Sequence, residues 1–130
     1  MKIYSLGTST RSIEEFIDLL KENGVKNAID IRRFPKSRLP HFCQETLKKA
    51  LEKAGLSYHY LGDSLGGFRK GGYEAYMESL DFKIGFEKLK EIAQKELSAF
   101  FCCERFPWRC HRRFIAKKLK EEGFEVKDLY

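Results

Sequence analysis

The segment from Phe100 to Phe114, FFCCERFPWRCHRRF, concentrates the chain's most reactive types of side chain. It holds three of the four cysteines, the only tryptophan, one of the three histidines and four arginines. A thiolate can act as a nucleophile or as a metal ligand, and arginines bind anions through charged hydrogen bonds. The segment therefore indicates a nucleophilic site, a metal site or an anion site.

An anion site is favoured by the helix that should begin near Cys110, because its partly positive N-terminus faces the preceding loop. Arg109 and Arg112 add full positive charges there, and the field favours the thiolate of a nearby cysteine. We expect Cys102 to be the nucleophile and Cys110 to contact the ligand.

Two carboxylates and a histidine complete the expected chemistry. Glu104 or Asp30 is the candidate acid or base, and His111 is the candidate proton partner or orienting residue. Asp30 has a second interpretation as a structural partner of an arginine, since buried ion pairs often involve carboxylates without catalysis.

A second basic cluster, DIRRFPKSR, follows a predicted strand. Arg32, Ser37 and Arg38 could hold a phosphate there through charge-assisted hydrogen bonds. Downstream, five glycines fall among the eleven residues 62–72, a density typical of a mobile loop or of close backbone approach to a ligand. We expect Gly66, Gly67 and Tyr76 to contribute to the binding site.

Two other interpretations of the cysteine segment are weaker. Five residues separate Cys103 from Arg109, as in the phosphate-binding loop of cysteine phosphatases, but the intervening residues include a glutamate, a proline and bulky aromatics, so we interpret the match as coincidental. Cys102, Cys110 and His111 depart from the usual spacing of zinc ligands. We therefore expect neither a metal nor a cofactor.

Strands and helices alternate along the chain. Strands are predicted at residues 2–7, 25–31, 56–61, 97–103 and 124–130, and helices at 12–24, 44–55, 73–80, 82–94 and 110–123. Short connections between alternating elements predict an α/β fold, with a mostly parallel sheet of about five strands in a single three-layer domain, residues 1–130, and helices on both faces. Ligands of such sheets bind beyond the carboxyl ends of the strands, where the unusual loops should converge.

Composition agrees with this picture. A length of 130 residues suits one domain, and the net charge of +6 favours an anionic partner such as a nucleotide or nucleic acid. No apolar run approaches the ~20 residues of a membrane helix, and the N-terminus does not resemble a signal peptide, so we expect a cytoplasmic protein without membrane association.

The ordered motifs SLGTSTRS, DIRRFPKSR, GDSLGG, YEAYM and CCERFPWRCHR resemble the domain of unknown function 488 family over essentially the whole chain. The resemblance implies a small α/β domain with a shared site. The positions that match are Asp30, Arg32, Pro35, Ser37, Arg38, Leu65, Gly66, Gly67, Tyr76, Cys102, Glu104, Cys110, His111 and Arg112. Thr8 stands where relatives commonly carry a histidine, so any role of that histidine is absent here or is taken by another group.

Three functions remain open from the sequence. The first is an enzyme that acts on a nucleotide or nucleic acid through Cys102 and an arginine-rich anion pocket. The second is a non-catalytic module that binds the same ligands. The third is a sulfur transferase similar to rhodanese, which the Asp30-Ile31-Arg32 segment and a cysteine at a strand end resemble, although the loop of small residues that would hold a persulfide is missing.

Overall fold

A parallel β-sheet forms the centre of the protein. The computed structural model describes residues 1–106 and 110–130, and within these ranges the sheet has five strands in the order β3-β2-β4-β1-β5. Every neighbouring pair is parallel. The strands are β1 (Lys2–Gly7), β2 (Asn27–Asp30), β3 (Ser57–Tyr60), β4 (Ser98–Cys102) and β5 (Glu125–Leu129).

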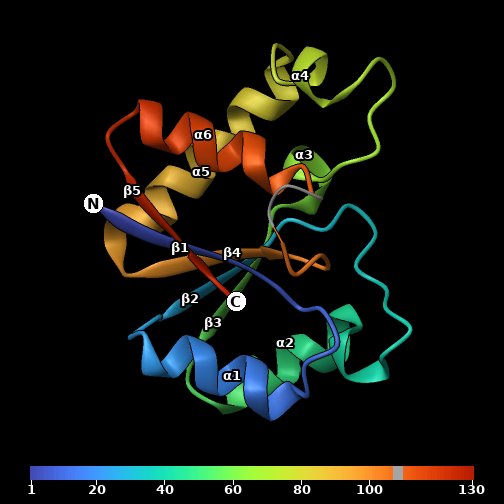
Figure 1. The fold of residues 1–130 in the computed structure, drawn as a ribbon, viewed down its shortest axis with the longest axis vertical. Coiled ribbons are helices and arrows are strands. Elements are labelled where there is room, and N and C mark those ends of the chain that lie inside the picture. The colour runs from blue at the N-terminus through green and yellow to red at the C-terminus, as the bar shows by residue number, and fades with distance from the viewer. Residues whose placement is uncertain (107–109) are drawn as a thin grey trace.

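Helices cover both faces of this sheet (Figure 1). One face carries α1 (Ile13–Glu22), the 3₁₀ turn η1 (Pro40–Phe42) and α2 (Gln44–Lys53), and the other carries α3 (Gly62–Leu65), α4 (Tyr73–Tyr76), α5 (Leu80–Lys95) and α6 (Arg112–Glu121). A separate apolar core fills each of the two layers between helices and sheet. The predicted three-layer α/β fold is therefore confirmed. Among the described residues, no helix has the length and apolar character needed to cross a membrane.

The start of α1 shows how local sequence determines an element. The Ser12 hydroxyl accepts a hydrogen bond from the Glu15 N–H at 3.0 Å, and the Glu15 carboxylate accepts one from the Ser12 N–H at 3.1 Å. This capping box satisfies two N–H groups that the helix itself cannot pair. Phe16 and Leu20, one turn apart, are then buried against the sheet.

β4 has helices on both sides, so its residues are all buried and alternate between the two cores. Ala99 and Phe101 face the α1–α2 layer, and Phe100 and Cys102 face the α5–α6 layer. This alternation places the Cys102 side chain on the side of the sheet where α6 begins.

Most boundaries differ from the sequence predictions by one to four residues, and two of the differences lie close to the sheet's carboxyl ends. The glycine-rich segment begins with one helical turn, α3, because the backbone N–H groups of Leu65 and Gly66 bond to the carbonyls four residues earlier. The last helix begins at Arg112 rather than near Cys110, and His111 precedes it without a side-chain cap.

The order of the strands creates a crevice at one edge of the sheet. β2 leads to β3 on one side, whereas the neighbouring β4 leads to β5 on the other side. The loops that follow β2 and β4 therefore diverge at the carboxyl ends of these strands. Such a switch point is where open α/β sheets bind their ligands.

Candidate active site

A cavity of about 330 Å³ lies at this switch point, between the loops that follow β2, β3 and β4. It contains side chains from all three loops and from the residues that lead into α6. Its lining residues are Arg32, Arg33, Phe34, Gly67, Phe68, Cys102, Cys103, Glu104, Cys110 and His111. The predicted convergence of separate loops on one site is thus present for the loops after β2, β3 and β4.

Arg112 organises the inner wall of this site. Its side chain is fully buried, and its Nε donates a hydrogen bond to Cys102 Sγ at 3.3 Å. Nη1 donates to Ser5 Oγ at 2.7 Å, and Nη2 donates to the carbonyls of Glu104 and Arg105 at 2.8 and 3.0 Å. One guanidinium therefore ties together β1, the end of β4 and the loop that follows it.

Contacts with Arg112 and Cys110 make Cys102 acidic. Burial alone would favour the neutral thiol, but the hydrogen bond from the Cys110 thiol and the charge and hydrogen bond of Arg112 outweigh it and lower the pKa of Cys102 to about 7. These contacts therefore favour the thiolate form of Cys102 more than that of an ordinary cysteine. The same hydrogen bond, together with burial, raises the pKa of Cys110, which stays a neutral donor.

His111 is held as a neutral imidazole. Burial is the main cause that lowers its pKa, to about 4, and the nearby charges of Arg112 and Arg69 act in the same direction. His111 Nε2 lies 3.2 Å from the carbonyl oxygen of Ile31, which only accepts, so Nε2 carries the proton. Nδ1 then carries no proton and lies 3.4 Å from Cys110 Sγ, whose single proton is directed to Cys102. His111 thus packs against Cys110, which contacts Cys102.

Cys103 differs from its neighbour although both line the cavity. It follows the strand and is exposed. Partial burial and the charges of Cys102 and Glu104 raise the pKa of Cys103. The structure therefore distinguishes one acidic thiol, Cys102, from one that remains protonated at neutral pH.

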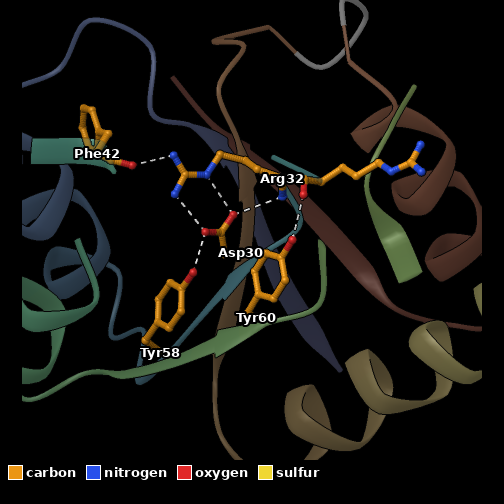
Figure 2. A network of polar contacts seen from close by, with 6 residues as sticks. Asp30, Arg32, Phe42, Tyr58 and Tyr60 are labelled. Atoms are coloured by element: carbon orange, nitrogen blue, oxygen red, sulfur yellow. Dashed lines mark hydrogen bonds and ion pairs between the residues drawn. The ribbon is translucent and has the colours of Figure 1, made fainter. Parts of the chain in front are cut away.

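Asp30 and Arg32 form a closed network beside the cavity. Arg32 donates to both carboxylate oxygens of Asp30, at 2.9 and 2.8 Å, and to the Phe42 carbonyl at 2.6 Å. Tyr58 donates its hydroxyl to Asp30 at 2.6 Å, and Figure 2 shows the carboxylate held between Tyr58 and the Arg32 fork. The Asp30 side chain is fully buried and does not line the cavity, so its contacts are those of a group that fixes Arg32.

The structure brings together only part of the predicted binding residues. Gly67 lines the cavity, and a Cβ on it would lie 3.0 Å from His111 Nδ1, so glycine allows close packing there. Gly66 packs on the backbone of Arg33 in the same way. Arg109, and Trp108 beside it, lie outside the described residues.

Five of the predicted binding residues that the structure describes are not among the cavity-lining residues: Ser37, Arg38, Gly66, Tyr76 and Arg112. The Ser37 hydroxyl accepts from the Leu39 N–H at 3.1 Å, and Arg38 is exposed. Tyr76 donates to the Ser64 carbonyl at 2.8 Å and carries the guanidinium of Arg69 4.0 Å from its ring centroid. These contacts support the neighbouring loops.

Sequence reasoning missed several residues of the site. Gly7 ends β1, and a Cβ there would overlap the Glu104 carbonyl. The next two residues bind the same segment, because the Thr8 and Ser9 N–H groups donate to the carbonyls of Cys102 and Cys103 at 2.8 and 2.9 Å. The sequence analysis also missed three cavity-lining residues: Arg33, Phe34 and Phe68. A cation and aromatic residues in loops that follow strands were the sequence features that could have indicated them.

The described residues contain no group of three histidine, cysteine, aspartate or glutamate side chains suited to hold a metal ion. The cavity is lined by Cys102, which bonds to the buried Arg112, and by Arg32 and Arg33, so nucleophilic chemistry of a thiolate is one reaction that these residues can support.

Comparisons with known proteins agree with the fold. A family model described as "Domain of unknown function DUF488" matches residues 12–119. The structure is similar to a crystal structure from Shewanella putrefaciens CN-32 described as a candidate phosphatase (DUF442), with a TM-score of 0.56 and 17% sequence identity over 92% of this chain and 68% of that one. No curated protein matches the sequence.

Proposed function

Since the chain belongs to the DUF488 family, a domain of unknown function, we propose its activity from the site itself: an enzyme that attacks the phosphate of a nucleotide or nucleic acid with the Cys102 thiolate. One observation carries this proposal. A buried arginine and a second thiol stabilise a thiolate that lines a cavity at the switch point of the sheet. Such perturbed groups in clefts are typical of catalytic sites.

Cations around the cavity support an anionic substrate. Arg33 lines its wall, and Arg112 bonds to the thiolate from within the core. Arg32 also lines the wall, but its charge is paired with Asp30. The ten-residue helix α6 begins next to the cavity-lining His111. The positive end of a helix and nearby guanidinium groups stabilise phosphate charge. They also stabilise the additional charge that develops on phosphoryl oxygens during transfer.

The proposed reaction has two steps. The Cys102 sulfur forms a bond to phosphorus while the bond from phosphorus to the leaving oxygen breaks, and that oxygen receives a proton. Water then attacks the phosphocysteine, releases phosphate and returns the thiolate. Glu104 lines the same cavity and is the proposed proton donor and acceptor, whereas His111 packs against Cys110.

The remaining predicted site residues have two proposed roles, one in positioning and one in binding the substrate. Asp30 is a positioning residue, because it fixes the Arg32 side chain at the cavity wall. Ser37, Arg38 and Tyr76, which do not line the cavity, are proposed to act on parts of the substrate that extend beyond it, and Arg109 stays a predicted ligand. The description of the similar structure as a candidate phosphatase names the same class of reaction, and the shared fold is compatible with it.

Phosphate release from a panel of phosphomonoesters and diesters, including nucleotides, tests the proposal. We expect Cys102→Ser to lower turnover by roughly a thousandfold or more, as loss of a nucleophile does elsewhere. Cys43→Ser, at a free cysteine that does not line the cavity, is the matched control and should keep activity within about threefold. Equal activity of Cys102→Ser and the wild type would refute the nucleophile. Nucleotide binding that persists in Cys102→Ser without turnover by the wild type would replace the enzyme with a binding module.

A further inference from the structure

Two phenylalanines stand exposed at the cavity. Phe34, in the loop after β2, is 62% exposed, and Phe68, in the loop after α3, is 86% exposed. Their ring centroids are 6.2 Å apart and their planes differ by 33°. Exposed apolar groups of this size beside a pocket often mark a binding surface. Other exposed large apolar residues of the described chain, such as Leu80 and Ile84 on α5, do not line this cavity.

The backbone conformation that leaves the Phe68 ring exposed is strained. Phe68 has a φ of +60°, a conformation that bulky residues rarely adopt. Arg33 Nη1 donates to the Phe68 carbonyl at 2.6 Å, and Arg69, which follows, donates to the carbonyls of Gly66 and Asp63 at 3.0 and 2.6 Å. The loop is therefore fixed by arginines on both sides while its aromatic side chain remains in solvent. Strain that the surroundings maintain in this way is typical of ligand-binding positions.

A cation accompanies the ring pair. Arg33 Cζ lies 5.4 Å from the centroid of Phe34, and Arg33 also lines the cavity that contains Cys102. A ligand that fits these groups has a flat aromatic face for the phenylalanines and negative charge for the arginines and the helix end. The cavity, at about 330 Å³, falls within the roughly 300–1,000 Å³ of small-molecule sites.

We propose that Phe34 and Phe68 form a stacking platform for the base of a mononucleotide whose phosphate lies in the cavity. This inference rests on the proposed function for the position of the phosphate. Stacking tolerates every base, because each base has a π-face, so the platform selects nucleotides over other phosphate esters without selecting one base. Phe34 and Phe68 are thereby specificity residues, and neither takes part in the transfer of the phosphoryl group.

Binding to the Cys102→Ser protein, which does not turn substrate over, separates the base from the phosphate. The probes are adenosine monophosphate and ribose 5-phosphate, which has the same sugar phosphate without the base. We expect adenosine monophosphate to bind more tightly by roughly 5- to 150-fold, the usual effect of one stacked base. Phe34→Ala and Phe68→Ala should reduce this ratio toward one and leave ribose 5-phosphate binding unchanged. Phe34→Tyr should keep the ratio, and Leu80→Ala, an exposed apolar residue outside the cavity, should not affect it.

Several results would overturn the platform. These are equal affinity for the two probes, a ratio that survives both alanine variants, or binding of a phosphotyrosine peptide or an oligonucleotide much tighter than of any nucleoside monophosphate. The outcomes remain separate from those of the proposed function. If adenosine monophosphate binds more tightly than ribose 5-phosphate but the wild type turns neither over, the stacking platform is supported and the proposed enzyme activity is refuted. If hydrolysis of ribose 5-phosphate and adenosine monophosphate depends on Cys102 but the two bind with equal affinity, the proposed enzyme activity is supported and the stacking platform is refuted.

Discussion

At the scale of single residues, arginines of the same sequence clusters have different roles. Arg112 and Arg32 are buried and use their guanidinium groups on internal partners, whereas Arg33 is half-buried and lines the cavity. The fork of a guanidinium can bond several acceptors at once, and a lysine ammonium cannot match that geometry. Arg112 therefore has a structural and an electrostatic role together, because the same group fixes the loop and stabilises the thiolate.

Arg112→Lys should destabilise the protein by about 2–4 kcal/mol, because several buried acceptors lose a charged donor. Urea unfolding measures the change, with Lys117→Gln on the exposed face of α6 as a control that should stay within about 0.5 kcal/mol. A stability for Arg112→Lys within the error of the wild type would mean that these hydrogen bonds do not hold the loop.

The residue scale is also where sequence reasoning reached its limit. Cys102, Glu104, Cys110 and His111 were predicted to lie together because they share one short segment, and all four line the cavity. The contact of Arg112 with Ser5 joins residues 107 positions apart, and no local pattern indicates it. Nor does the sequence show that the guanidinium groups of Arg32 and Arg112 are already engaged, since charge clusters look alike whether they are buried or solvated.

At the scale of elements, the connection between β4 and α6 depends on the end of β1. The strands pair in parallel, with Gly7 opposite Cys102, and the chain after β4 passes directly over Gly7. Periodicity predicted each strand to within two residues at its ends, because apolar runs bounded by turns are clear signals. It did not predict the close approach over Gly7, which arises only when β1 and β4 lie side by side.

Gly7→Ala should therefore disturb the site from outside it. Its Cβ would overlap the Glu104 carbonyl, and we expect a loss of about 1–3 kcal/mol in stability and slower alkylation of Cys102. Gly55→Ala is the control. Gly55 has a φ of +88° with no atom near its missing Cβ, so the substitution carries about 1–2 kcal/mol of backbone strain alone. If both variants leave Cys102 alkylation unchanged, the packing of β1 does not position the loop.

At the scale of the whole molecule, the burial of His111 couples stability to pH. The folded protein holds His111 neutral with a pKa of about 4, whereas an unfolded histidine titrates near 6.5. Between these values the unfolded chain binds more protons, so the free energy of unfolding must fall as the pH decreases. Burial lowers the pKa of His59 as well, which adds to the same trend.

Unfolding measured from pH 7 to pH 4 should show this loss, and His111→Gln should reduce its slope by up to about 1.4 kcal/mol per pH unit. The comparison of the two proteins at each pH cancels the titration of the surface carboxylates that they share. Identical slopes would show that His111 takes up its proton in the folded state.

The fold itself followed from the sequence, since alternating strands and helices allow few arrangements. The strand order also explains why the site lies between β2 and β4, where the chain changes direction across the sheet. The sequence could not predict that Phe34 and Phe68 are exposed at the cavity, because a phenylalanine in a loop can equally well be buried and hold the loop against the core. Their exposure is a property of the folded molecule.

The central claim is that Cys102, which is buried but lines the cavity, is a thiolate at neutral pH. Iodoacetamide alkylation of the native protein across pH, resolved for each cysteine by mass spectrometry, tests it most directly. The structure predicts a midpoint near pH 7 for Cys102, and for Cys103 a midpoint above that of free cysteine, near 8.5. A Cys102 that stays unreactive until the pH of free cysteine, or a Cys103 that reacts at lower pH than Cys102, would contradict the account.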